Sequence, residues 1–256
     1  MILALDVGNT NIVVGCLDSG KIVREFRLSA NISKTEDEYA SGIKNILDFH
    51  GITRENLVGA VMSSVVPPLT GVLKNAVRLL AGVDPIVVGA GIKTGINILI
   101  DDPAQLGSDM VATAVGALAS YKPPVIIADL GTATKLSVLD KNGGFTGGAV
   151  MPGVKLSVGA LAAGTSQLPK VPIEAPHKCI STNTIDCMKS GAVFGAASMI
   201  DGMTERFEAE LGYPAQIVAT GGLADVVCRH CRRDITVDPH LILRGLGIIY
   251  EKNVKK

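Results

Sequence analysis

The chain contains no tryptophan, few aromatic residues and little charge. Of its 256 residues, 4% are aromatic and 19% are charged. The 24 lysines and arginines balance the 24 aspartates and glutamates, so the formal net charge is zero. A protein that binds nucleic acid or an anionic membrane through charge carries a basic excess. The composition therefore argues against both kinds of partner.

Features of secreted and membrane proteins are also missing. The five cysteines are an odd number, which argues against a secreted disulfide framework. The first apolar run meets Asp6 too early for a signal peptide, and no uncharged apolar stretch reaches membrane-spanning length. We therefore expect a cytoplasmic protein. Cys228 and Cys231 form a CxxC pair, which allows zinc binding or redox chemistry, but ordinary thiols are favoured because no second pair exists.

Apolar residues, in contrast, are abundant. They make up 47% of the sequence, and the mean hydropathy is +0.37. A chain of this length and composition has enough apolar residues for two small domains, each with its own core. A net charge near zero with much apolar surface favours self-association.

The first fifteen residues carry the most informative pattern, which is MILALDVGNTNIVVG. A short apolar strand ends at Asp6, a turn with Gly8 and small polar residues follows, and a second apolar run begins at Ile12. Such a turn can donate backbone N–H groups to a polyphosphate, and Asp6 would act through Mg²⁺, because a carboxylate repels phosphate. An ordinary hairpin with an Asn/Gly turn is the alternative interpretation.

The same design occurs again in the second half of the chain. Residues 126–140 read IIADLGTATKLSVLD, with Asp129 at the end of an apolar strand, and residues 217–223 read IVATGGL. A Gly-Gly pair lets a flat group such as an adenosine lie against bare backbone. Together, the two hairpins and the late glycine pair resemble the actin/hexokinase/Hsp70 ATPase architecture.

The order of predicted elements supports a duplication. Three strands are predicted over 2–5, 12–16 and 21–28, followed by helices and short strands, and the pattern restarts with strands over 125–129, 135–139 and 145–150. We predict an α/β protein of two ribonuclease-H-like (actin-like ATPase) domains, 1–118 and 119–256, with an ATP cleft between them. Further helices are predicted over 153–163, 184–211, 223–231 and 239–253.

Two other motifs are not explained by nucleotide binding. Asp109 opens a predicted helix in the motif Gly107-Ser108-Asp109. An acid at this position is often only a helix cap, but it could also take a proton from an attacking hydroxyl group as a general base. The glycines and prolines of residues 147–153 indicate backbone that packs closely against something.

These motifs together resemble the type III pantothenate kinase family, whose relatives include Bvg accessory factors. The resemblance runs nearly from end to end and rests on motifs in the following order: Asp6–Asn11, Ser64–Pro67, Pro103 with Gly107 and Asp109, Asp129–Thr134, Gly147-Gly148, Pro152-Gly153, Asn183-Thr184, Ser190-Gly191, Thr220–Gly222 and Leu246-Gly247.

The resemblance implies a site and an activity. The expected reaction is ATP-dependent phosphorylation of pantothenate, the first step of coenzyme A biosynthesis, by a homodimer. ATP would be bound by Asp6, Val7, Gly8, Asn9, Thr10, Asn11, Ile12, Val13 and Thr132. Pantothenate would contact Gly107, Ser108, Asp109 and Thr184. Asp109 would be the catalytic base, Asp6 would serve Mg²⁺ through the phosphates, and Asp129 would hold K⁺ or NH₄⁺.

Three positions depart from the family pattern. The family usually has Arg where this chain has Met110, Tyr where it has Ile100, and more often Thr where it has Lys135. Met110 and Ile100 are on the acceptor side. They leave two alternatives open, namely a kinase for another small hydroxylated acceptor, or a non-catalytic nucleotide-binding paralogue with a regulatory role.

Overall fold

The computed structural model describes residues 1–254 and divides into two compact units. Unit 1 comprises Met1–Ile96, Asp101–Ala119 and the described residues from His240 onward, and unit 2 comprises Asn97–Ile100 and Ser120–Pro239. In this division, one segment of unit 1 ends at Ala119, and the described residues from His240 onward, which include the C-terminal helix, group with unit 1. The predicted domain ranges, 1–118 and 119–256, stay predictions.

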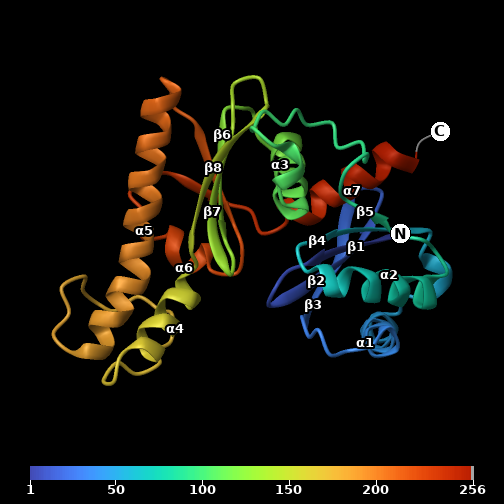
Figure 1. The fold of residues 1–256 in the computed structure, drawn as a ribbon, viewed down its shortest axis with the longest axis horizontal. Helices are drawn as coiled ribbons and strands as arrows, with labels where there is room; N and C mark the ends of the chain where they lie inside the picture. The colour runs from blue at the N-terminus through green and yellow to red at the C-terminus, as the bar shows by residue number, and fades with distance from the viewer. Residues whose placement is uncertain (255–256) are drawn as a thin grey trace. The chain divides into compact units, whose positions relative to one another are not determined.

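Unit 1 holds a five-stranded sheet and four α-helices (Figure 1). Its strands are β1 (Ile2–Val7), β2 (Asn11–Asp18), β3 (Lys21–Ser29), β4 (Gly59–Ser64) and β5 (Ile86–Val87). Its helices are α1 (Glu36–Phe49), α2 (Pro67–Ala81), α3 (Ser108–Ser120, whose last residue is counted with unit 2) and α7 (Leu241–Val254), with short 3₁₀ turns at Arg54–Asn56 and Pro103–Gln105.

The first sheet has the order β3-β2-β1-β4-β5. β1 pairs antiparallel with β2 and parallel with β4, so that Asp6 lies opposite Ser63 and Val7 opposite Ser64. β1 is central, and its apolar residues Leu3, Leu5 and Val7 are fully buried. Because the carboxyl ends of β1 and β4 meet at one edge, polar residues that follow them gather there.

Helices cover both faces of this sheet. α1 begins with a capping box, in which Thr35 accepts from Glu38 N and Glu38 accepts from Thr35 N. α1 and α2 pack together on one face, and α7 contacts β1, β4 and β3, which places it on the opposite face (Figure 1).

α3 and α7 approach each other very closely. A Cβ atom added to Gly116 would lie 1.9 Å from the carbonyl oxygen of Leu241, and one added to Gly245 would lie 1.8 Å from that of Ala112. Only glycine permits backbones to approach so closely. This contact explains why Gly245 lies within α7, and it fixes α3, which carries Asp109, against α7.

Unit 2 repeats the plan with β6 (Val125–Leu130), β7 (Ala133–Leu139), β8 (Phe145–Pro152), β9 (Gln216–Thr220) and β10 (Ile235–Val237). The strand order is β10-β9-β6-β7-β8. Read in the opposite direction, this is the order of the first sheet, with β6 to β10 as the counterparts of β1 to β5. The predicted duplication of architecture is therefore confirmed. Its helices are α4 (Val154–Gly164), α5 (Thr184–Leu211) and α6 (Ala224–Cys228), and they gather on one side of the sheet (Figure 1).

Most predicted elements agree with the structure, and two differ from it. α5 has the predicted bounds, because Asn183 caps it by accepting from Asp186 N and Gly212 ends it with φ 76°. α6 is shorter than predicted and ends at Cys228. β10 was not predicted, since a strand of three residues that is only partly buried carries little periodic signal. Along residues 1–254, no helix combines the length and the apolar character that a membrane span requires.

Candidate active site

The carboxylate of Asp6 lies at the carboxyl end of β1, next to β4. Ser63 Oγ donates a hydrogen bond of 2.8 Å to Asp6 Oδ1, and Ser63 is fully buried. A buried hydroxyl that donates to one carboxylate oxygen fixes the orientation of the group. Asp6 is only partly buried, so it presents an oriented negative charge at this edge.

A second pair of serines fixes the start of α3 to the same edge. Ser108 Oγ accepts from Ser64 N at 3.0 Å and donates to Ser64 O at 3.1 Å. Since Ser64 is the last residue of β4 and lies opposite Val7, the helix that carries Asp109 begins beside the end of β1. The predicted acceptor residues Gly107, Ser108 and Asp109 thus share a sheet edge with Asp6.

Asp109 is the second residue of α3 rather than its cap. Its Oδ1 accepts a 2.8 Å hydrogen bond from Met110 N, which stabilises the first turn of the helix. A Cβ atom at Gly107 would lie 2.5 Å from the same oxygen, so a side chain there would displace the carboxylate. The glycine of this motif therefore leaves the space that the Asp109 carboxylate occupies.

The turn between β1 and β2 contains most of the predicted ATP-binding residues. Asp6 and Val7 end β1, and Asn11, Ile12 and Val13 begin β2. Gly8 N donates to Asn11 O at 3.0 Å and Ala30 N donates to Thr10 O at 3.0 Å. Asn9, Thr10 and Asn11 are exposed.

Unit 2 presents the corresponding hairpin between β6 and β7. Asp129 is the penultimate residue of β6 and is partly buried. Gly131 N donates to Ala133 O at 3.1 Å across the turn, and Thr132 is exposed at its tip. Lys135 Nζ lies 2.9 Å from Asp129 Oδ2. The two hairpins therefore have the same construction, and in the second hairpin the acid forms an ion pair with a lysine of the following strand.

Glycines hold this second hairpin in place. A Cβ atom at Gly153, which caps α4, would lie 2.2 Å from Thr132 O, and one at Gly221 would lie 2.7 Å from the backbone of Leu130. Gly148 packs equally closely on β7 at Leu136 O. The predicted close packing of residues 147–153 is confirmed, and its partners are β7 and the Thr132 turn.

The remaining acceptor-side residues are spread over both units. Thr184 is exposed and begins α5, Ile100 belongs to the short segment counted with unit 2, and Met110 follows Asp109 in unit 1. Their assignments to a pantothenate site stay predictions.

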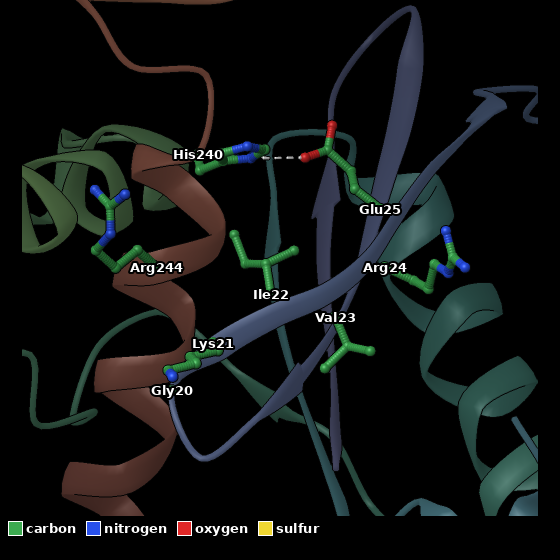
Figure 2. Close-up of a pocket in the computed structure, with 8 residues that line it drawn as sticks. All are labelled: Gly20, Lys21, Ile22, Val23, Arg24, Glu25, His240 and Arg244. Carbon is green, nitrogen blue, oxygen red and sulfur yellow. Dashed lines mark hydrogen bonds and ion pairs between the residues drawn. The ribbon is translucent and has the colours of Figure 1, made fainter.

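Unit 1 also has a groove (Figure 2). It has a volume of about 490 Å³ and is lined by Gly20, Lys21, Ile22, Val23, Arg24, Glu25, His240 and Arg244. Glu25 Oε2 and His240 Nδ1 approach to 3.0 Å across it, as the dashed line shows. None of its lining residues belongs to the predicted site.

In the CxxC pair, Cys228 is buried, and Cys231 is half-buried and lies beside α5. Cys231 Sγ donates weakly to Ala197 O at 3.7 Å. The pKa of the Cys228 thiol is lowered by a hydrogen bond from the Cys231 thiol, and the pKa of Cys231 is raised by the same contact and by burial. Within the described part of the chain, no three His, Cys, Asp or Glu side chains are grouped so as to hold a metal ion.

Comparison with known proteins connects these observations. The family model described as type III pantothenate kinase matches residues 2–206. The chain belongs to the type III pantothenate kinase family. A protein of that name from an Exiguobacterium strain is 40% identical over 255 residues, which cover 100% of both chains. One from Halalkalibacterium halodurans is 39% identical over 254 residues, covering 99% of this chain and 100% of the relative.

Solved structures show the same fold at low sequence identity. A putative 2-dehydro-3-deoxygalactonokinase from Sinorhizobium meliloti gives a TM-score of 0.65 at 11% identity and covers 100% of both chains. A ROK family glucokinase from Streptomyces griseus, in complex with glucose and AMPPNP, gives 0.56 at 14% identity and covers 98% of each chain. These similarities confirm the predicted actin-like ATPase fold of this pantothenate kinase family member. At such low identity they show the fold alone.

Two features of the site were not predicted from the sequence. One is Ser63, although a Ser-Ser pair at the end of the apolar strand 59–62 marks the edge where ligands bind in such sheets. The other is the pairing of Lys135 with Asp129, for which the alternation of Lys135 with Leu136 on β7 is the available signal.

Proposed function

We propose that this chain transfers the γ-phosphoryl group of ATP to the primary hydroxyl of pantothenate and so produces 4′-phosphopantothenate. The proposal rests on the match of the whole chain to type III pantothenate kinases, together with the position of Asp6 and Asp109 at one edge of the first sheet. Phosphoryl transfer depends mainly on positioning and on neutralisation of charge, and this edge offers residues for both.

Asp6 fits a role with Mg²⁺. Carboxylate oxygens are the ligands that Mg²⁺ prefers, and Ser63 orients the Asp6 carboxylate. The ion, bound together with ATP phosphates, would neutralise charge on the transferred group. The exposed turns at Gly8–Asn11 and Gly131–Thr132 would donate N–H and hydroxyl hydrogen bonds to phosphates.

Asp109 fits the role of general base. Its carboxylate is partly buried at the start of α3, where Met110 N donates to Oδ1 and Gly107 leaves room for it. It would accept the proton of the attacking hydroxyl, an effect that contributes ~10²–10⁴-fold. Gly107, Ser108 and Thr184 would line the pantothenate site.

The resemblance also assigns a monovalent cation, K⁺ or NH₄⁺, to Asp129. The Asp129 carboxylate in this chain already forms an ion pair with Lys135. The cation therefore has a competitor of the same charge inside the protein.

A homodimer in the cytoplasm is the expected state of the enzyme. Large apolar side chains of unit 2 that are about half exposed or more support association: Val150, Leu156, Leu161, Ile180 and Ile185. Size-exclusion chromatography with light scattering would show twice the chain mass of 26.5 kDa, and a monomer at micromolar concentration would contradict the proposal.

A second function is kept because of Met110 and Ile100. Neither side chain can form the charged or hydrogen-bonded contact that Arg or Tyr would form in the family. A panel of hydroxylated metabolites in the same assay tests this alternative, since a different acceptor would support turnover where pantothenate does not. Nucleotide binding without turnover on any acceptor would favour the regulatory paralogue.

The test of the proposed function is ATP consumption with pantothenate, Mg²⁺ and K⁺ present. We expect ADP and phosphopantothenate to form in equal amounts, measured by a coupled assay and mass spectrometry. The variant Asp109→Asn, purified in the same way, controls for a contaminating kinase.

A further inference from the structure

The ion pair between Asp129 and Lys135 is built into the β6–β7 hairpin. The two residues are direct partners in the antiparallel register, and Lys135 Nζ lies 2.9 Å from Asp129 Oδ2. Opposite residues of an antiparallel pair project from the same face of the sheet with their Cβ atoms about 5 Å apart. The pairing therefore follows from the register.

The pair is also shielded from solvent. The side chains of Lys135 and Asp129 are 17% and 25% exposed, whereas both partners of the surface pair between Lys44 and Asp48 are about half exposed or more. Ion pairs that are partly buried are screened much less by salt than exposed ones. The ammonium group of Lys135 is thus a fixed positive charge at Asp129.

A monovalent cation does not fit beside this ammonium group. K⁺ or NH₄⁺ at Asp129 would bring a second positive charge against the same carboxylate, and like charges at such distances repel strongly where the environment is partly buried. The fixed charge is already supplied by the chain itself.

We propose that Lys135 takes the place of the monovalent cation, so that this enzyme needs neither K⁺ nor NH₄⁺. This inference rests on the proposed function. Lys135 acts as a positioning residue, because it holds the Asp129 carboxylate and keeps one positive charge beside the turn that carries Thr132.

The experiment compares four forms of the full chain in K⁺, Na⁺ or choline chloride at equal ionic strength. They are the wild type, Lys135→Arg, Lys135→Thr and the control Lys141→Thr, which changes an exposed lysine of the β7–β8 turn. The readouts are kcat/KM for ATP, and the affinity for a fluorescent ATP analogue in the absence of pantothenate.

We expect the wild type, Lys135→Arg and Lys141→Thr to differ less than about twofold between the three salts. Lys135→Thr removes the charge, so its activity and nucleotide affinity should fall about tenfold or more in choline and recover in K⁺. Recovery by the ion alone distinguishes the loss of a charge from damage to the hairpin. If Lys135→Thr does not fold, as judged by circular dichroism, Lys135→Gln replaces it.

Three results would overturn the inference. One is a wild type that K⁺ activates about tenfold over choline, with proportionate gain in nucleotide affinity. Another is that the activity of Lys135→Thr, or of Lys135→Gln in its place, is the same in all three salts. The third is that this variant loses activity and nucleotide affinity but K⁺ does not restore them. A wild type that binds the nucleotide but never consumes ATP with pantothenate would contradict the proposed function instead, and the binding titrations would still decide the role of Lys135.

Discussion

Ser63 and Asp6 lie opposite each other on neighbouring parallel strands, and Ser63 Oγ donates a 2.8 Å hydrogen bond to Asp6 Oδ1. The bond crosses from β4 to β1 and joins residues 57 positions apart in the chain. It holds the acid of the first hairpin in one orientation. An oriented carboxylate is what a Mg²⁺-dependent phosphate site requires.

Removing this hydroxyl should therefore weaken nucleotide use. We expect Ser63→Ala to lower kcat/KM for ATP by about 3–30-fold, since a hydrogen bond to a charged group contributes about 1–2 kcal/mol. Steady-state kinetics with varied ATP and excess Mg²⁺ measure the effect. Ser41→Ala, at an exposed position of α1, serves as the matched control and should behave as the wild type does. An equal loss in both variants would show that Ser63 has no special role.

Asp109 is predicted to be the general base. Asp109→Asn retains the size of the side chain and removes the proton acceptor, so kcat should fall by at least ~10²-fold while ATP affinity changes little. Turnover kinetics and nucleotide titrations on the same protein separate the two effects. Turnover close to that of the wild type would leave Asp109 with only its structural role, in which it accepts the Met110 N–H.

The contact between α3 and α7 predicts an effect on stability. Gly116→Ala would place a methyl group against the carbonyl oxygen of Leu241, at 1.9 Å if nothing moved, so we expect a loss of about 1–3 kcal/mol or more. Gly42→Ala in α1, where nothing lies within 4 Å of the new Cβ, should gain about 0.5–1 kcal/mol from helix propensity. Urea denaturation of both variants tests the contrast, and equal stabilities would mean that the helices do not pack as described.

The departures at Ile100 and Met110 predict a weakened acceptor site. If pantothenate is the acceptor, the double substitution Ile100→Tyr with Met110→Arg should lower its KM or raise kcat/KM, by up to ~100-fold if both contacts form. The single variants must be measured too, because neighbouring contacts couple. An unchanged KM for pantothenate in all three variants would show that other residues bind the acceptor.

Much of the fold could be predicted, because strong local signals coincide with the elements. The α5 helix has its cap at Asn183 and its end at Gly212, and both hairpins have an acid and a glycine at their turns. The place of α7 could not be predicted in this way. Its buried residues Leu241, Leu243 and Leu246 show that the helix is buried, but not that it packs on the first sheet rather than the second.

The acids of the candidate site could be predicted from the sequence, but the residues that pair with them could not. Asp6, Asp109 and Asp129 follow strands or open a helix, which is visible in the sequence. The partners Ser63 and Lys135 are determined by strand pairing, and a register is specified by the whole sheet rather than by a local pattern. The resemblance to a family identified the acids but implied a cation where this chain has a lysine.

The central claim, that this chain phosphorylates pantothenate, is tested most directly by ATP consumption with and without that acceptor. We expect pantothenate-dependent formation of ADP, with phosphopantothenate in equal amount, and a rate that is at least ~10²-fold lower in Asp109→Asn. ATP consumption that pantothenate does not change, in a protein that is folded and binds nucleotide, would contradict it.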